Sequence, residues 1–243
     1  MSAMDDRPTI LGSPGERARF SGLLRAALPL GAVLVLCGYA LGALNPWQAG
    51  LPTAARGAVV LLLAGGIFFA TAATQGRVDA FFKGARGEEQ VAMLLATLPA
   101  TYTVLHGVEL GKVGLWRGRN LDHLVVGPTG ITLVETKNWQ GRVTFAEGRL
   151  TVNGADPTRS PIDQVRAGAR ILSAWLAVRL PGAAPVRPLV CFVGRALDGD
   201  RIAVDEITLC NSGRLVEAIV SATGNGLDPA TQARVVRLLA QQV

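Results

Sequence analysis

A carboxylate and an ammonium group stand two positions apart at the end of an apolar stretch, in the segment GITLVETKNWQG (residues 130–141). Alternate side chains of a strand point to the same face, so Glu135 and Lys137 should project together. A turn after the preceding apolar segment would bring Asp122 close to Glu135. The spacing therefore predicts two acids and one base in a single half-buried site.

This combination of groups suggests a particular chemistry. Two crowded carboxylates repel each other, and at least one takes up a proton unless a cation is bound. Asp122 and Glu135 offer the oxygen ligands that suit Mg²⁺ or Mn²⁺, and the backbone carbonyl of Thr136 is available as a third ligand. Lys137 could orient a water molecule or stabilise charge developing on a phosphate. We expect metal-assisted hydrolysis of a phosphodiester.

Two further polar residues interrupt apolar helix faces. Glu88 continues the apolar face of a helix predicted over residues 87–98, where it could hold or tune a metal ion. Gln164 lies on a mostly apolar face of a helix beginning at Ser160, where it could hold a water molecule or a phosphate. By spacing alone, a solvated strand end, a helix-dipole acid and a surface amide remain open alternatives for these side chains.

The basic residues point to a polyanionic partner without requiring one, since the net charge is +6. Arg117 and Arg119 lie just before Asp122, while Arg166 and Arg170 lie one helical turn apart. We expect these four to contact phosphates, with ordinary surface charge as the alternative. Three cysteines without a CxxC pair indicate neither a disulfide framework nor a zinc site, and two histidines make a histidine-based nucleophile relay unlikely to be the mechanism.

The elements that must position these residues follow from hydrophobic periodicity and turn signals. The order of helices and strands predicts an α/β domain with a mixed sheet. The predicted helices cover residues 87–98, 160–178, 212–223 and 229–241, and the predicted strands cover 102–110, 121–126, 131–137, 141–145, 150–152, 188–194 and 202–209.

Two uncharged apolar stretches precede this domain, at residues 26–44 and 57–74. Each would span roughly 27–29 Å as a helix, about the thickness of the hydrocarbon layer of a bilayer. Arginine and lysine residues flank the outer ends of the pair, whereas the loop between the stretches has only Arg56, so both termini should be cytoplasmic. The alternatives are two buried core helices or, for the first stretch, a cleaved signal peptide.

Three motifs can be considered together: GARGEE (84–89), NLDHLVVGPTGITLVETKNWQGRV (120–143) and SPIDQVRAGARIL (160–172). In this order they resemble a known family, the nuclease-related or NERD domain. The resemblance implies a PD-(D/E)xK, restriction-endonuclease-like fold. It also implies that the catalytic set is Glu88, Asp122, Glu135, Lys137 and Gln164, with metal ligands drawn from the three acids and the Thr136 carbonyl.

The expected organisation is a cytoplasmic tail (1–25), a transmembrane hairpin (26–74) and a nuclease-like domain (84–243). The expected function is a membrane-anchored, Mg²⁺-dependent nuclease whose partners are the lipid bilayer and nucleic acid, with DNA favoured. One alternative is a non-catalytic, membrane-tethered nucleic-acid-binding or scaffold module. Another is a protein-interaction domain that meets its partner through the terminal helices.

Overall fold

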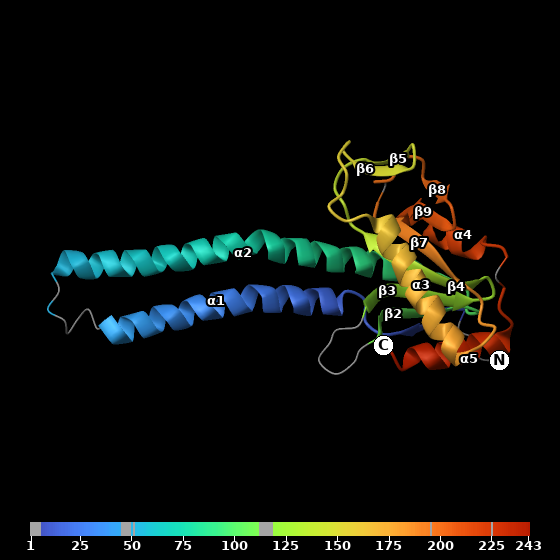
Figure 1. Cartoon of the computed structure of the whole chain (residues 1–243), viewed down its shortest axis with the longest axis horizontal. Coiled ribbons are helices and arrows are strands. Elements are labelled where there is room, and N and C mark those ends of the chain that lie inside the picture. Colours follow the sequence, from blue (N-terminus) through green and yellow to red (C-terminus); the bar gives the residue numbers. More distant parts are fainter. Residues whose placement is uncertain (1–5, 45–49, 51, 112–118, 195, 225) are drawn as a thin grey trace. The chain divides into compact units, whose positions relative to one another are not determined.

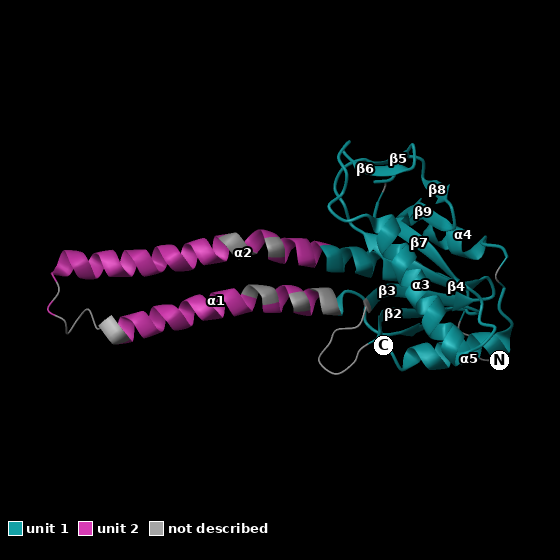
Figure 2. Cartoon of the chain, viewed as in Figure 1, with its two compact units in different colours: residues 1–16, 84–243 teal, residues 17–83 magenta. Residues whose placement is uncertain are grey.

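The computed structural model describes residues 6–44, 50, 52–111, 119–194, 196–224 and 226–243. The chain divides into two compact units, one formed by residues 1–16 with 84–243 and the other by residues 17–83 (Figure 2).

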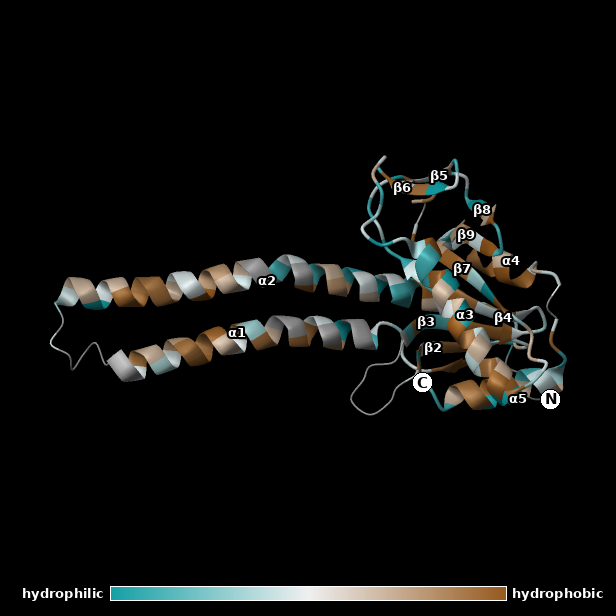
Figure 3. Ribbon diagram, viewed as in Figure 1, coloured by the Kyte–Doolittle hydropathy of each residue, from teal (hydrophilic) through white to brown (hydrophobic). Residues whose placement is uncertain are grey.

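The smaller unit consists of α1 (Glu16–Leu44) and most of α2 (Thr53–Leu95). Gly22–Gly42 and Thr53–Ala72 are long and apolar enough to cross a membrane, and the most apolar window of each has no buried residue. Hydrophobic residues make up long stretches of both helices (Figure 3). Their side chains are exposed, for example those of Val35, Leu62 and Phe69. These stretches are therefore not the buried core helices that the sequence left as an alternative.

The larger unit is built on a seven-stranded mixed sheet with the order β1-β2-β3-β4-β7-β9-β8 (Figure 1). The central strand β4 pairs antiparallel with β3 and parallel with β7. A separate hairpin is formed by β5 and β6. The strands are β1 (Thr9–Leu11), β2 (Thr103–Leu110), β3 (Arg119–Gly127), β4 (Gly130–Lys137), β5 (Val143–Ala146), β6 (Arg149–Val152), β7 (Val186–Phe192), β8 (Arg201–Val204) and β9 (Ile207–Asn211).

Helices cover both faces of the sheet. On one face, α3 (Pro161–Arg179) and α5 (Pro229–Ala240) pack on a core that includes Leu124, Leu133 and Phe192. On the other face, the C-terminal turns of α2 and the short α4 (Leu215–Val220) pack on a core that includes Val134 and Cys191. Alternating side chains of β4 thus enter opposite cores, which explains why this strand reads as a continuous apolar run. The predicted mixed α/β architecture is confirmed.

Most predicted elements are present, and the differences have local causes. The segment predicted as one strand at 202–209 is two antiparallel strands, β8 and β9, because a two-residue turn at Asp205 and Glu206 folds it back on itself. Asp205 adopts a φ of 50° there, a conformation that Asp tolerates better than most residues. The helix predicted at 87–98 is the end of the 43-residue α2, and the helix predicted at 212–223 begins as a 3₁₀ turn (Ser212–Arg214).

The segment before α1, predicted as part of a separate tail over residues 1–25, contributes to the larger unit instead. Residues Thr9–Leu11 form β1, which pairs in parallel with β2 at the edge of the sheet. A strand of three residues is too short for a periodic pattern, and its partner β2 lies about ninety residues further along the chain.

Candidate functional site

Glu135 and Lys137 lie at the carboxyl end of β4, on the same face as the strand alternation requires. Lys137 Nζ lies 2.7 Å from Glu135 Oε1, and the two side chains are only 15% and 8% exposed. At this depth each charge needs a partner, because an isolated buried charge costs several kcal/mol, on the order of 3–5. The predicted pairing of acid and base on one face is confirmed.

Asp122 occupies an irregular position in β3. The pairing of β2 with β3 passes from His106–His123 to Val108–Leu121, leaving out Gly107 and Asp122, and Gly107 has a φ of 64°. The pairing of β3 with β4 ends at His123–Val134. Beyond this point a side chain replaces the backbone acceptor: Oδ2 of Asp122 accepts a hydrogen bond of 2.9 Å from the backbone N–H of Thr136. This contact brings Asp122 to the same strand end as Glu135.

Glu88 reaches the site from the last turns of α2. The residue before it, Gly87, allows a close approach, since a Cβ at that position would lie 2.6 Å from Cβ of Asn138 just after β4. Glu88 Oε2 accepts a hydrogen bond of 3.0 Å from the backbone N–H of Gly15, in the segment between β1 and α1. A helix, a strand end and the N-terminal segment therefore meet at this carboxylate.

Gln164 comes from the first turn of α3. The helix starts as predicted, with Ser160 Oγ accepting a hydrogen bond from the N–H of Asp163 and Pro161 in the first turn. Gln164 Oε1 accepts a hydrogen bond of 3.0 Å from Lys137 Nζ. The ammonium group of Lys137 is thus fixed between a carboxylate and an amide, so its position is defined by two elements.

The three acids interact electrostatically. Burial raises the pKa of Asp122 well above its usual value of 3.8, and the nearby Glu135 and Glu88 carboxylates raise it further, against the Thr136 N–H and Lys137. Burial also raises the pKa of Glu88, with the Gly15 N–H opposing and Glu135 adding to the effect. Both acids therefore hold a proton more strongly than an exposed carboxyl does, and a bound dication would oppose this effect by stabilising the charged forms.

The donor set suits a hard cation held partly by water. Among the residues that the structure describes, no three His, Cys, Asp or Glu side chains are grouped as a complete metal cage. Oxygen donors are nevertheless gathered at one strand end, and Mg²⁺ typically binds through one or two carboxylates while it keeps several water molecules. The residues present therefore fit a partly hydrated Mg²⁺ or Mn²⁺ better than a zinc ion, which prefers nitrogen and sulfur ligands.

Of the four arginines predicted to contact nucleic acid, the structure describes the side chains of two, Arg166 and Arg170. Arg117 and the side chain of Arg119 lie outside the described residues. Arg166 forms ion pairs of 3.1, 3.4 and 3.5 Å with the carboxylates of Asp205, Glu206 and Asp163, so its charge is engaged within the protein. Arg170 is exposed and lines a cavity of about 500 Å³ on α3.

Sequence reasoning missed several residues around the site. Asn120 and Arg159 line a cavity of about 520 Å³ together with Gln164. The position of Asn120 could have been inferred, because it lies two residues before Asp122 on the same strand. The contact of Gly15 with Glu88 has no local signal, since it joins segments that are distant in the sequence.

The two histidines form a buried pair with each other. His106 Nδ1 and His123 Nδ1 are 2.7 Å apart and buried between β2 and β3. Burial lowers the pKa of His106 to about 4 and that of His123 well below its usual value. Both rings are therefore neutral structural groups at physiological pH.

Comparison with known proteins supports the resemblance seen in the motifs. Residues 83–193 match the family model of the nuclease-related domain, NERD, and this segment contains all five site residues. An uncharacterized protein of Bacillus anthracis is 38% identical over 71 residues, which is 27% of this chain and 31% of that protein. The chain thus spans about a third of the length of this relative. No solved structure matches the chain.

Proposed function

We propose, on the premise that residues 83–193 form a nuclease-related domain, that this chain is a metal-dependent nuclease which hydrolyses phosphodiester bonds of nucleic acid. The observation that carries the proposal is the convergence of polar side chains at the end of β4. Lys137 Nζ contacts Glu135 and Gln164, and Asp122 bonds to the backbone between them in sequence, at Thr136. Burying this cluster of polar and charged side chains at a strand end costs folding free energy, which indicates that the cluster serves a function rather than packing.

Each residue has a distinct proposed role. Lys137, oriented by Gln164, holds the attacking water molecule and offers positive charge to the phosphate oxygens as negative charge develops on them. Asp122 and Glu135 would hold the cation, assisted by the Thr136 carbonyl. Glu88, whose carboxylate accepts a hydrogen bond from the N–H of Gly15, would tune the field at the cation or hold a second one. None of these roles requires a covalent intermediate on the protein.

The proposed cofactor is Mg²⁺, with Mn²⁺ able to replace it. When bound, the cation would supply Lewis-acid polarisation of the phosphodiester and lower the pKa of a nearby water molecule. The raised pKa values of Asp122 and Glu88 support this assignment, because a dication would stabilise the charged form of both carboxylates.

Nucleic acid is the proposed substrate, and DNA is favoured over RNA. The basic net charge of +6 gives a general attraction to polyanions. Exposed Arg159 and Arg170 lie on the edge of cavities that adjoin the site, so they can contact the phosphates that flank the scissile bond.

The lipid bilayer is the second proposed partner. The two exposed apolar helices would span the membrane, with both termini and the nuclease-related domain on the cytoplasmic side. Lysine and arginine at the outer ends of the spans support this orientation, against a single Arg56 between them. The proposed enzyme therefore acts on nucleic acid that approaches the inner membrane surface.

The test uses the full chain in detergent micelles, because a fragment beginning after the spans would lack β1 and Gly15. Plasmid DNA, linear duplex, single-stranded DNA and RNA of the same sequence are incubated with Mg²⁺, Mn²⁺ or EDTA. We expect cleavage that requires the cation and falls by about 100-fold or more in Lys137→Ala. Failure to cleave any of the four, or cleavage unaffected by Lys137→Ala, would rule out the catalytic proposal.

The same preparation distinguishes a nuclease from a non-catalytic nucleic-acid-binding module. Asp122→Asn should abolish cleavage and weaken Mg²⁺ binding while DNA affinity stays equal or rises, because one negative charge has been removed. A binding module would show DNA affinity without cleavage in the wild-type protein as well.

A further inference from the structure

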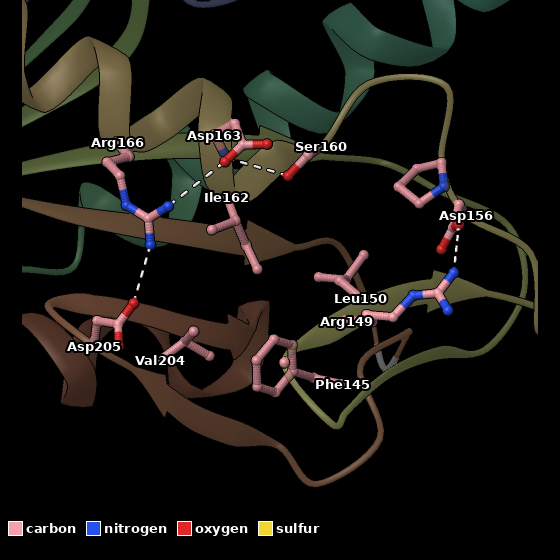
Figure 4. Close-up of a pocket in the computed structure, with 12 residues that line it drawn as sticks. Phe145, Arg149, Leu150, Asp156, Ser160, Ile162, Asp163, Arg166, Val204 and Asp205 are labelled. Carbon is pink, nitrogen blue, oxygen red and sulfur yellow. Dashed lines mark hydrogen bonds and ion pairs between the residues drawn. The ribbon is translucent and has the colours of Figure 1, made fainter.

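A cavity of about 660 Å³, here called the hairpin slot, lies beside α3 but is not part of the acidic site (Figure 4). It is bounded by the β5–β6 hairpin, the N-terminal turn of α3, and the turn between β8 and β9. Pockets of this size hold small organic groups, and recognition in them combines apolar walls with a few polar contacts.

The walls of the slot are apolar. Phe145 and Leu150 come from the two strands of the hairpin, Ile162 from α3, and Val204 from the end of β8. Figure 4 shows these four side chains pointing into the space between two groups of ion pairs. The half-buried Phe145 is the only aromatic ring among the residues that line the slot, and it is the group best suited to stack on a flat ligand.

The rim of the slot carries arginines and carboxylates that pair with one another. On one side Arg149 pairs with Asp156 at 2.7 Å. On the other, Arg166 pairs with Asp205 at 3.1 Å and with Asp163 at 3.5 Å. A phosphate would have to compete with these carboxylates, whereas an uncharged ring with hydrogen-bonding edges would not. The rim therefore favours a neutral, planar, polar-edged group over an anion.

The slot lies next to a second cavity, and Gln164 of the acidic site lines that second cavity. The slot shares Ser160 and Asp163 with the cavity of about 520 Å³ that Gln164 also lines, and Gln164 bonds to Lys137. A third cavity, of about 500 Å³, shares Asp163 and Arg166 with the slot. The three cavities thus have lining residues in common along α3, and this succession of neighbouring cavities suits an extended chain better than a compact molecule.

We propose that the hairpin slot receives one unpaired nucleobase of the substrate strand, stacked on Phe145. This inference rests on the proposed function and deepens it, because it makes single-stranded or frayed nucleic acid the preferred substrate. The phosphates on either side of that base lie toward Arg159 and Arg170, two exposed arginines that line the neighbouring cavities. Stacking on an aromatic ring tolerates any base, so the slot selects for unpairing rather than for sequence.

The test measures binding of the full chain in micelles, with Ca²⁺ replacing Mg²⁺ to prevent cleavage. The probes are a fluorescent single strand of about 12 nucleotides and an abasic strand of the same length, a length within the range covered by single-strand binding sites. We expect Phe145→Leu to weaken binding of the base-bearing strand about 10-fold and to leave the abasic strand unchanged. Phe145→Trp should keep the preference for bases.

Two controls make the result specific. Trp175→Leu removes another partly buried aromatic ring that packs against the same hydrophobic core but lines none of the three cavities, and it should change neither affinity. A strand carrying 5-iodouracil should crosslink to the peptide that contains Phe145 on irradiation, and thermal unfolding of each variant should verify folding. The proposal would be overturned if Phe145→Leu lost the same affinity for both strands, or lost none for either. It would also be overturned if the crosslinks formed only with other peptides.

The outcome also separates the slot from the proposed function. If the wild-type protein cleaves nucleic acid but shows no Phe145-dependent preference for bases, the base-binding role of the slot is refuted and the proposed nuclease function is not. Absence of both binding and cleavage would refute the nuclease and the slot together.

Discussion

The backbone N–H of Gly15 donates a hydrogen bond of 3.0 Å to Oε2 of Glu88, across 73 positions of sequence. Gly15 has a φ of 71°, and a Cβ there would lie 2.9 Å from the backbone oxygen of Ala85. The segment that precedes the first apolar helix is thus fitted against the helix turn that carries a site acid. This contact opposes the protonation that burial favours for Glu88.

Gly15→Ala should destabilise the protein and weaken its response to Mg²⁺. The new Cβ is strained by the positive φ and meets the backbone near Ala85, which should cost about 1–3 kcal/mol of unfolding free energy. Gly154→Ala is the matched control, because Gly154 has a φ of 82° with open space around it. The prediction is contradicted if both variants lose the same stability and keep the same increase in melting temperature with Mg²⁺.

Asp122→Asn should raise the melting temperature of the metal-free protein at neutral pH. Because the pKa of Asp122 is raised in the folded state, ionisation opposes folding as the pH rises above 3.8. Asparagine avoids this cost and can still accept the hydrogen bond from Thr136. Each kcal/mol recovered corresponds to roughly 2–4 °C for a protein of this size.

The stabilisation by Asp122→Asn should disappear in two conditions. Below pH 3.8 the wild-type carboxyl is also neutral, so the two melting temperatures should converge. Added Mg²⁺ should stabilise the wild-type protein and not the variant. A variant that melts below the wild type in EDTA at neutral pH would show that the carboxylate stabilises the fold.

Gln164→Leu should reduce cleavage about 10-fold or more without unfolding the protein. The substitution removes the acceptor that orients Lys137 Nζ but preserves the bulk of the side chain. Gln164→Glu retains an acceptor oxygen and should recover part of the rate. Equal rates for wild type and Gln164→Leu would mean that Glu135 alone positions the lysine.

The buried histidine pair should make the protein acid-sensitive. The pKa of His106 is lowered to about 4 and that of His123 is also lowered, so the unfolded chain takes up protons before the folded one. Stability should be complete above pH 6.5 and fall as the pH decreases from 6.5 toward 4. The loss amounts to about 1.4 kcal/mol per pH unit for each imidazole.

A double variant, His106→Leu with His123→Leu, isolates this effect from the site acids, whose raised pKa values act in the opposite direction. Chemical denaturation at several pH values should give a shallower pH dependence for the double variant than for the wild type. Identical slopes would assign the acid sensitivity elsewhere.

The proposed membrane orientation predicts the behaviour of reporter fusions. Green fluorescent protein attached after Val243 should fluoresce, and alkaline phosphatase at the same position should be inactive, because this end is proposed to be cytoplasmic. A phosphatase inserted in the loop between the spans should be active. Replacing Arg77, Lys83 and Arg86 with glutamine while adding lysines to that loop should weaken or reverse this pattern.

The acid–base core of the site could be predicted from sequence because strand geometry fixes it. Alternation places Glu135 and Lys137 on one face, and a short turn after β3 sets the register that brings Asp122 alongside. The Ser160 cap likewise predicts where α3 begins, and therefore on which side of the helix Gln164 lies.

The remaining parts depend on contacts that leave no local pattern. The ion pairs of Arg166 require the turn at Asp205 and Glu206, which lies about forty residues away in sequence. The hairpin slot exists because β5 and β6 pack next to α3 and the end of β8, although the hairpin itself was predicted. Composition could suggest that an arginine binds phosphate, but only tertiary structure shows which carboxylates already engage it.

The break in pairing around Asp122 has a consequence for the evolution and engineering of this domain. In a regular sheet, β2, β3 and β4 would pair along their whole length. The backbone N–H of Thr136 would then bond to a neighbouring strand and would not be available to the Asp122 carboxylate. The site therefore lies where strand pairing is interrupted, next to Gly107 with its positive φ. Substitutions that restore regular pairing there should give a more stable protein in which the Asp122 carboxylate no longer reaches the backbone N–H of Thr136.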